Sequence, residues 1–118
     1  AGGREYVFPI TELVCETEFF DYKAKYEGLS REITPAPLDE AIVRKVNAMT
    51  LSAYKALNCR GVVRIDFIVK GDEPYMIEVN TIPGMSAHSI VPQQARCMGM
   101  SLGELYDLII EDTSKANA

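Results

Sequence analysis

The stretch RIDFIVKGDEPYMIEVN, residues 64–80, decides the fold of this protein. Its β-branched and aromatic residues predict a β-hairpin with strands at residues 62–69 and 75–80, joined by the Gly- and Pro-containing residues 70–74. An arginine, two carboxylates and an asparagine interrupt the apolar pattern at Arg64, Asp66, Glu78 and Asn80. Polar side chains in such a hairpin need a chemical reason.

Side chains alternate between the two faces of a strand. A hairpin that turns about Asp72 places Asp66 opposite Glu78. The same register places Arg64 opposite Asn80, so these polar residues share one face. The other face then carries apolar residues that cover a core: Val63, Ile65, Phe67, Val69, Tyr75, Ile77 and Val79.

Two carboxylates at directly opposed strand positions have Cβ atoms about 5 Å apart and repel each other unless a positive charge lies between them. Mg²⁺ prefers one or two carboxylates, and an amide oxygen such as that of Asn80, substrate phosphates and water can complete its ligands. Arg64 is permanently charged and forked, which suits phosphate oxygens. The pattern therefore indicates a site for a divalent cation and a phosphorylated substrate.

A solvated sheet face is the simpler explanation, because Arg, Asp and Glu often form weak pairs across exposed strands. The residues that follow the hairpin favour a ligand site instead. They read NTIPGM at residues 80–85, and a glycine after a proline at a strand end lets backbone N–H groups approach a ligand.

Helices are expected on both sides of the hairpin. Residues 39–58 repeat apolar side chains at steps of three and four, with Asp39 as N-cap. Residues 90–98 predict a short helix, and Ser101 and Glu104 form a capping box that opens a C-terminal helix.

The N-terminal part is less regular. Residues 6–14 predict a strand that lies at an edge or carries a bulge, because Pro9 cannot donate to a ladder, and residues 17–37 predict a long loop. The expected fold is therefore α/β of the α+β kind, with a mostly antiparallel sheet, helices on one face and the site on the other.

Composition sets further limits. A chain of 118 residues, 47% hydrophobic and 25% charged, is one globular domain's worth of sequence. A net charge of -5 without a long basic run argues against a nucleic-acid partner. No apolar run approaches the roughly 20 residues of a membrane span, and no export signal is visible, so we expect no membrane contact and a cytoplasmic location. Cys15, Cys59 and Cys97 are widely spaced and predict reduced thiols.

Several short motifs, in a fixed order, resemble one family. R-I-D-F at residues 64–67, E-V-N-T-I-P-G-M at 78–85 and S-A-H-S-I-V-P at 86–92 look like the C-terminal part of a D-alanine–D-alanine ligase, an ATP-grasp enzyme. F-D-Y-K-A-K-Y at residues 20–26 resembles the ω-loop of the same enzymes.

The resemblance implies an enzyme that joins two D-alanines with ATP, through a D-alanyl phosphate, to make the terminal dipeptide of bacterial peptidoglycan precursors. Asp66, Glu78 and Asn80 match the family's Mg²⁺ (or Mn²⁺) ligands. Arg64 and the backbone N–H of Gly84 match the groups that hold the transferred phosphate and the developing oxyanion.

Other positions match groups that bind the substrates. Lys25 matches a lysine that reaches the ATP phosphates, and Tyr26 a tyrosine that helps to close the active site. Ser89 and the N–H of Ile90 match the groups that bind the carboxylate of the second D-alanine, and their place before a predicted helix independently suits an anion. A plain N-cap serine is the other interpretation of Ser89. Tyr26, where depsipeptide-forming relatives typically have a histidine nearby, favours D-alanine as acceptor.

By this resemblance, residues 1–118 are the C-terminal portion of an ATP-grasp domain, with a flexible ω-like loop at about residues 17–37. The N-terminal and small ATP-binding domains are missing, so we expect the chain to be inactive alone and the full-length enzyme to be a homodimer. Two alternatives stay open: another ATP-grasp carboxylate–amine ligase, and a non-catalytic domain derived from the same fold. Glu5 and His88 receive no role.

Overall fold

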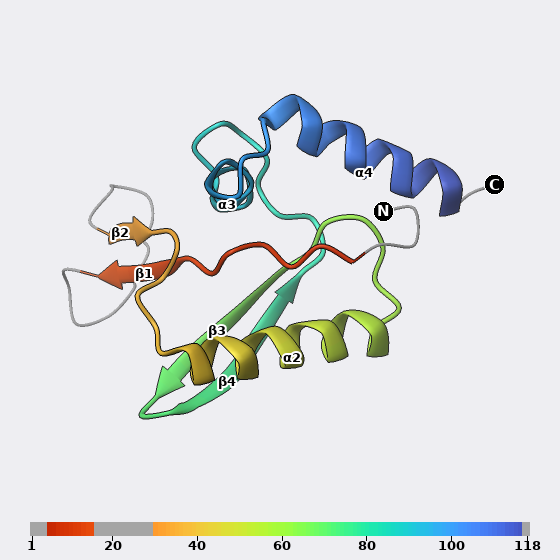
Figure 1. Ribbon diagram of the computed structural model, residues 1–118. Coiled ribbons are helices and arrows are strands. Elements are labelled where there is room, and N and C mark those ends of the chain that lie inside the picture. The colour runs from red at the N-terminus through yellow and green to blue at the C-terminus, as the bar shows by residue number, and fades with distance from the viewer. Residues whose placement is uncertain (1–4, 16–29, 117–118) are drawn as a thin grey trace.

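The computed structural model describes residues 5–15 and 30–116 of the chain (Figure 1). In chain order its elements are β1 (Glu12–Cys15), β2 (Ser30–Ile33), α2 (Glu40–Ala56), β3 (Arg64–Lys70), β4 (Glu73–Asn80), α3 (Ile90–Cys97) and α4 (Leu102–Ala116). The strands form two separate antiparallel sheets, β1–β2 and β3–β4, each of two strands. The α+β class is the predicted one. Within the described residues, no helix is both long enough and apolar enough to cross a membrane.

The turn of the β3–β4 hairpin is tighter than predicted. Lys70 pairs with Glu73, so Gly71 and Asp72 alone form the turn, and Pro74 already belongs to β4. Gly71 has a φ of 64°, a left-handed conformation that glycine adopts without steric cost and that tight hairpin turns require.

Helix α2 runs alongside the hairpin and packs against β4 (Figure 1). Its buried residues, Ile42 and Val46, lie one turn apart and are 7% and 5% exposed. Lys45 Nζ donates to the Asp72 carbonyl and to a Glu73 carboxylate oxygen, both at 3.1 Å. These contacts hold the helix to the hairpin turn.

The two ends of α2 differ. Asp39 is the N-cap as predicted, but its side chain makes no capping hydrogen bond. Beyond the C-terminal end, Asn58 and Gly61 have φ values of 53° and 65° and reverse the chain. The Tyr54 hydroxyl donates to the Gly61 carbonyl, and the Gly61 N–H donates to an Asp112 carboxylate oxygen of α4, both at 2.8 Å. Burial raises the pKa of the Tyr54 hydroxyl, and Asp112 adds to the shift, so this group stays a donor.

Helices α3 and α4 pack against each other and form the main apolar cluster. Val91, Ala95 and Leu105 lie at its centre, at 3%, 0% and 2% exposure. Partly buried residues surround them: Phe8, Val62, Met85, Met100, Leu102 and Ile109. The predicted capping box of α4 is confirmed, because the Glu104 N–H donates to Ser101 Oγ at 3.1 Å and the Ser101 N–H to a Glu104 carboxylate oxygen at 3.4 Å.

The N-terminal strand is shorter than predicted. Residues 6–11 are not part of a strand, and β1 begins only at Glu12, beyond Pro9 and its missing N–H. Part of the predicted loop at residues 17–37 is in fact β2, which pairs with β1. Its sequence SREI lacks strand character by itself, so pairing with β1 decides its conformation. Residues 16–29 lie outside the described part of the chain.

The substitution Leu105→Ala tests whether the contact between α3 and α4 is the stabilising core. We expect it to lower the stability of both helices by about 2–5 kcal/mol, because it removes a buried side chain and leaves a cavity. Hydrogen exchange of peptides from α3 and α4 measures this loss. Ile110→Ala, at a side chain of the same helix that is 62% exposed, is the matched control and should change stability by about 0.5 kcal/mol at most. Equal effects of the two substitutions would contradict the assigned core.

Candidate active site

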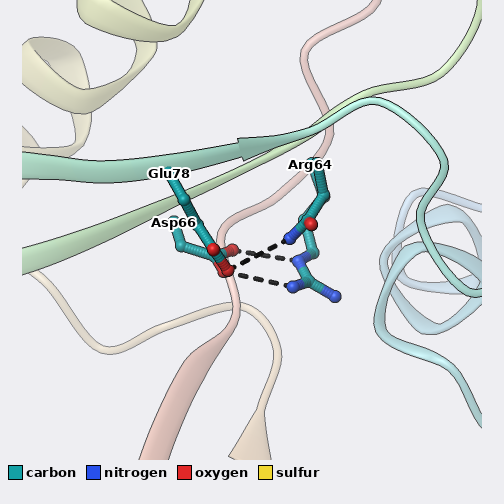
Figure 2. A network of polar contacts seen from close by, with 4 residues as sticks. Arg64, Asp66 and Glu78 are labelled. Carbon is teal, nitrogen blue, oxygen red and sulfur yellow. Dashed lines mark hydrogen bonds and ion pairs between the residues drawn. The ribbon is translucent and has the colours of Figure 1, made fainter.

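The polar residues predicted to form a site lie together at the open end of the hairpin (Figure 2). Strands β3 and β4 pair Asp66 with Glu78. They pair Arg64 with Asn80, so the predicted register is confirmed at this end. In Figure 2 the Asp66 and Glu78 side chains project from neighbouring strands toward the guanidinium of Arg64.

Each carboxylate has a polar partner. Arg64 holds Asp66 in a forked ion pair, with Nε 2.9 Å from Oδ1 and Nη2 3.1 Å from Oδ2. Asn80 Nδ2 donates to Glu78 Oε1 at 3.4 Å. The guanidinium offsets the repulsion between the carboxylates. Asn80 therefore turns its amide nitrogen, not the predicted oxygen, toward Glu78, and a rotation of the amide group exchanges the two.

The chemistry of this donor set fits a hard divalent cation. Two carboxylates face each other, and an amide that can supply an oxygen follows on β4. In the described ranges no three His, Cys, Asp or Glu side chains gather as a metal site. A cation at Asp66 and Glu78 would therefore depend on Asn80 and on oxygen atoms from a substrate or water.

A bulge beside Asp66 changes the pattern that simple alternation predicts. It brings Tyr75 opposite Ile68. Tyr75 therefore lies on the face of the polar site, although the sequence predicted it at a core position. Ile68, Tyr75 and Ile77 are 59%, 56% and 57% exposed. Ile68 and Ile77 line the same cleft as the carboxylates. Ile68 lies on this face by simple alternation with Asp66, but the sequence interpretation missed Tyr75 there, since neither Gly nor Pro marks the bulge.

The loop between β4 and α3 holds the predicted Gly84 and Ser89. A Cβ on Gly84 would lie 3.0 Å from Ser89 Oγ, so close packing explains the glycine. The Ser86 N–H donates to Ser89 Oγ at 3.2 Å, and the two hydroxyl oxygens lie 2.8 Å apart. The Tyr106 hydroxyl of α4 donates to the Met85 carbonyl at 2.7 Å and anchors the loop.

One open cleft, with a volume of about 1630 Å³, joins the hairpin to this loop. Its lining includes Arg64, Asp66, Glu78, Gly84, Ser89 and Ile90. The cleft is larger than the roughly 300–1,000 Å³ of a usual small-molecule site.

Four other residues were singled out from the sequence. Lys25 and Tyr26 lie outside the described residues, so their roles stay predictions. Glu5 lines an outer part of the cleft and forms an ion pair with Lys55 at 3.3 Å. His88 is exposed and is not among the residues that line the cleft.

The fold is that of a segment of an ATP-grasp ligase. The chain belongs to the family described as D-ala D-ala ligase C-terminus, whose family model matches residues 2–111. The fold and the family resemblance expected from the sequence are thus confirmed.

Named relatives agree with this assignment. The chain is 48% identical over 109 residues to a D-alanine–D-alanine ligase of Flavobacterium johnsoniae, with 92% of this chain and 34% of the relative covered. It resembles the crystal structure of a D-alanine–D-alanine ligase from Bacillus anthracis complexed with ATP, with a TM-score of 0.79, 34% identity and 92% of this chain covered. A D-Ala:D-Ser ligase from Enterococcus faecalis follows with a TM-score of 0.73 and 32% identity over 90% of this chain. The chain spans about a third of each, at 34%, 34% and 32% of their lengths.

The substitution Gly84→Ala tests the close packing of the loop. The added methyl group meets Ser89 Oγ at 3.0 Å, so we expect the Ser89 hydroxyl to move and to release the Ser86 N–H. Hydrogen exchange of the Ser86 amide, followed by NMR, should become faster. Gly103→Ala is the matched control, because its Cβ meets nothing closer than 4.0 Å. An unchanged Ser86 amide in Gly84→Ala would contradict this packing.

Proposed function

We propose that this chain is the catalytic C-terminal segment of an ATP-dependent ligase that forms D-alanyl-D-alanine for peptidoglycan precursors. The observation that carries the proposal is the Asp66–Glu78 pair with Arg64 beside it, in a hairpin that matches the ligase family. A domain kept only for association has no need for two carboxylates that repel each other, which disfavours the non-catalytic alternative. Eight curated relatives at 43–48% identity are named D-alanine–D-alanine ligases, which disfavours another carboxylate–amine ligase.

The reaction has two steps. A carboxylate oxygen of the donor D-alanine attacks the γ-phosphorus of ATP, the bond to ADP breaks, and D-alanyl phosphate forms. The neutral amine of the acceptor D-alanine then attacks the carbonyl carbon, inorganic phosphate leaves, and the amide nitrogen loses one proton. Arg64 and the backbone N–H of Gly84 stabilise the charge that develops on phosphate and carbonyl oxygens. Preorganised donors of this kind contribute about 3 kcal/mol each.

Asp66, Glu78 and Asn80 are the proposed ligands of Mg²⁺ (or Mn²⁺), which would neutralise the phosphate oxygens of ATP. The forked ion pair supports this role. The side chains of Arg64 and Asp66 are 26% and 31% exposed, and a partly exposed ion pair contributes only about 0–1 kcal/mol. Arg64 can therefore exchange Asp66 for a phosphate oxygen at little cost.

The exposed apolar surface next to the carboxylates suits the base of a nucleotide. Ile68 and Ile77 line the cleft on the same hairpin as the proposed phosphate site. The flat base of a nucleotide buries apolar surface against such side chains, while the phosphates of the nucleotide lie at the polar end of the hairpin. Lys25 is proposed to reach the same phosphates and Tyr26 to help close the site, as the family resemblance implies.

Ser89 Oγ and the N–H of Ile90 are proposed to bind the carboxylate of the acceptor. The first N–H groups of a helix have no partner within it, and the helix dipole favours an anion there. D-alanine is the proposed acceptor, because curated relatives at 43–48% identity are named D-alanine–D-alanine ligases and because Tyr26 stands where depsipeptide-forming relatives typically have a histidine nearby.

The chain is proposed to act within a larger enzyme that contributes the donor site and the rest of the nucleotide site. An apolar surface cleft supports this, since Ile82 and Ile110 line it and are 93% and 62% exposed, and a contiguous exposed apolar patch commonly marks a contact. We also propose that the full-length enzyme is a homodimer and that it is located in the cytoplasm, where ATP is abundant.

The native gene product that contains this sequence should release phosphate from ATP only when D-alanine is added, and should form the dipeptide in equal amount. A phosphate assay with detection of D-alanyl-D-alanine by mass spectrometry measures both. The separate segment of residues 1–118 should be inactive in the same assay. Absence of D-alanine-dependent phosphate release from the native product would overturn the proposed function.

Substitutions Asp66→Asn and Glu78→Gln test the metal site. Each removes one anionic ligand, so we expect activity to fall at least about 100-fold and half-maximal activity to require more Mg²⁺. A titration of activity against Mg²⁺ concentration measures both effects. Asp72→Asn is the matched control, because it removes the same charge from the turn of the same hairpin. If Asp72→Asn lowers activity as much as Asp66→Asn, general charge rather than metal binding explains the effect.

A further inference from the structure

Ser86 and Ser89 are joined by hydrogen bonds of both their backbone and their side-chain atoms. The Ser89 N–H donates to the Ser86 carbonyl at 2.9 Å, which closes a turn just before α3. In the other direction the Ser86 N–H donates to Ser89 Oγ at 3.2 Å, and the hydroxyl oxygens lie 2.8 Å apart. The Ser89 Oγ atom thus contacts both the backbone N–H and the hydroxyl of Ser86.

The Ser89 hydroxyl does not cap α3, although Ser89 is the N-cap residue. A capping side chain accepts the N–H of the second or third helical residue. The third helical residue here is Pro92, which has no N–H. The first-turn N–H groups of Ile90 and Val91 therefore have no partner within the helix and can face a ligand.

The hydrogen atom of the Ser89 hydroxyl can point in only one direction. A serine hydroxyl has one hydrogen and two lone pairs, and Ser89 Oγ already accepts the Ser86 N–H. If Ser89 donates to Ser86 Oγ, it has no hydrogen left for a carboxylate. If Ser86 donates instead, both lone pairs of Ser89 Oγ are used, and its hydrogen must be donated outward. The Ser86 hydroxyl decides between these states.

We propose that Ser86 is a positioning residue for the acceptor: its hydroxyl donates to Ser89 Oγ and directs the Ser89 hydrogen toward the acceptor carboxylate. This inference rests on the proposed function. The donated bond also polarises the Ser89 hydroxyl, which strengthens its own hydrogen bond to an anion.

Other contacts hold the loop in place, so the role of Ser86 is separable from folding. The Tyr106 hydroxyl binds the Met85 carbonyl at 2.7 Å on one side of the turn. Gln93 Nε2 donates to the His88 carbonyl at 2.8 Å and to a Glu32 carboxylate oxygen at 3.1 Å on the other side. Loss of the Ser86 hydroxyl leaves these contacts and the main-chain turn intact.

The test compares Ser86→Ala and Ser86→Thr in the native gene product with two assays. Hydroxylamine traps the acyl phosphate as a hydroxamate and requires only ATP and the donor D-alanine. Dipeptide formation also requires the acceptor. In Ser86→Ala we expect hydroxamate formation within about twofold of wild type and the D-alanine concentration for half-maximal dipeptide formation to rise about tenfold. Ser86→Thr keeps a hydroxyl and should restore the wild-type value.

The outcomes separate this inference from the proposed function. A Ser86→Ala variant with unchanged dipeptide formation, or with both assays reduced equally, would overturn the positioning role. A wild-type protein that fails both assays would instead overturn the ligase assignment. Ser52→Ala, at an exposed serine of α2, is the matched control and should behave as wild type.

Discussion

Asp66 and Glu78 face each other across β3 and β4. Their negative charges repel each other, and the neighbouring side chains of the candidate site offset this repulsion. Arg64 and Asn80 provide the partners that make this pairing tolerable. A site of this kind gains stability when a cation binds between its carboxylates. The proposed metal and phosphate ligands would relieve the repulsion that weakens the hairpin by itself.

The bulge in β4 changes which side chains of the two strands lie opposite each other. Ile68 follows Asp66 on the same face of β3 by simple alternation. The bulge beside Asp66 places Tyr75, instead of Met76, opposite Ile68, and both Ile68 and Ile77 are exposed in the cleft. The proposed nucleotide site thus joins a polar end for phosphates to an apolar end for a base. Bulges next to functional sites commonly redirect side chains in this way.

The loop between β4 and α3, which carries Gly84 and Ser89, is held in place by hydrogen bonds from the helices that follow it. Met85 is bound by Tyr106 of α4, and the His88 carbonyl by Gln93 of α3, so the helices determine the path of the loop. Helices α3 and α4 in turn form the best-buried apolar cluster, around Leu105. The proposed binding groups at Gly84 and Ser89 are in this way placed by a rigid core, and both residues line the cleft.

Local chemistry alone determined the hairpin, its register at the polar end, the helices and the capping box at Ser101, because alternation, helical periodicity and capping act over a few residues. It also identified the residues of the candidate site, as carboxylates placed opposite each other in that register. Tertiary structure decided the rest. The bulge has no local signal, β2 forms only because β1 pairs with it, and Ser89 Oγ contacts Ser86 in a turn that α3 and α4 hold. These features depend on contacts between segments distant in sequence, which no local pattern records.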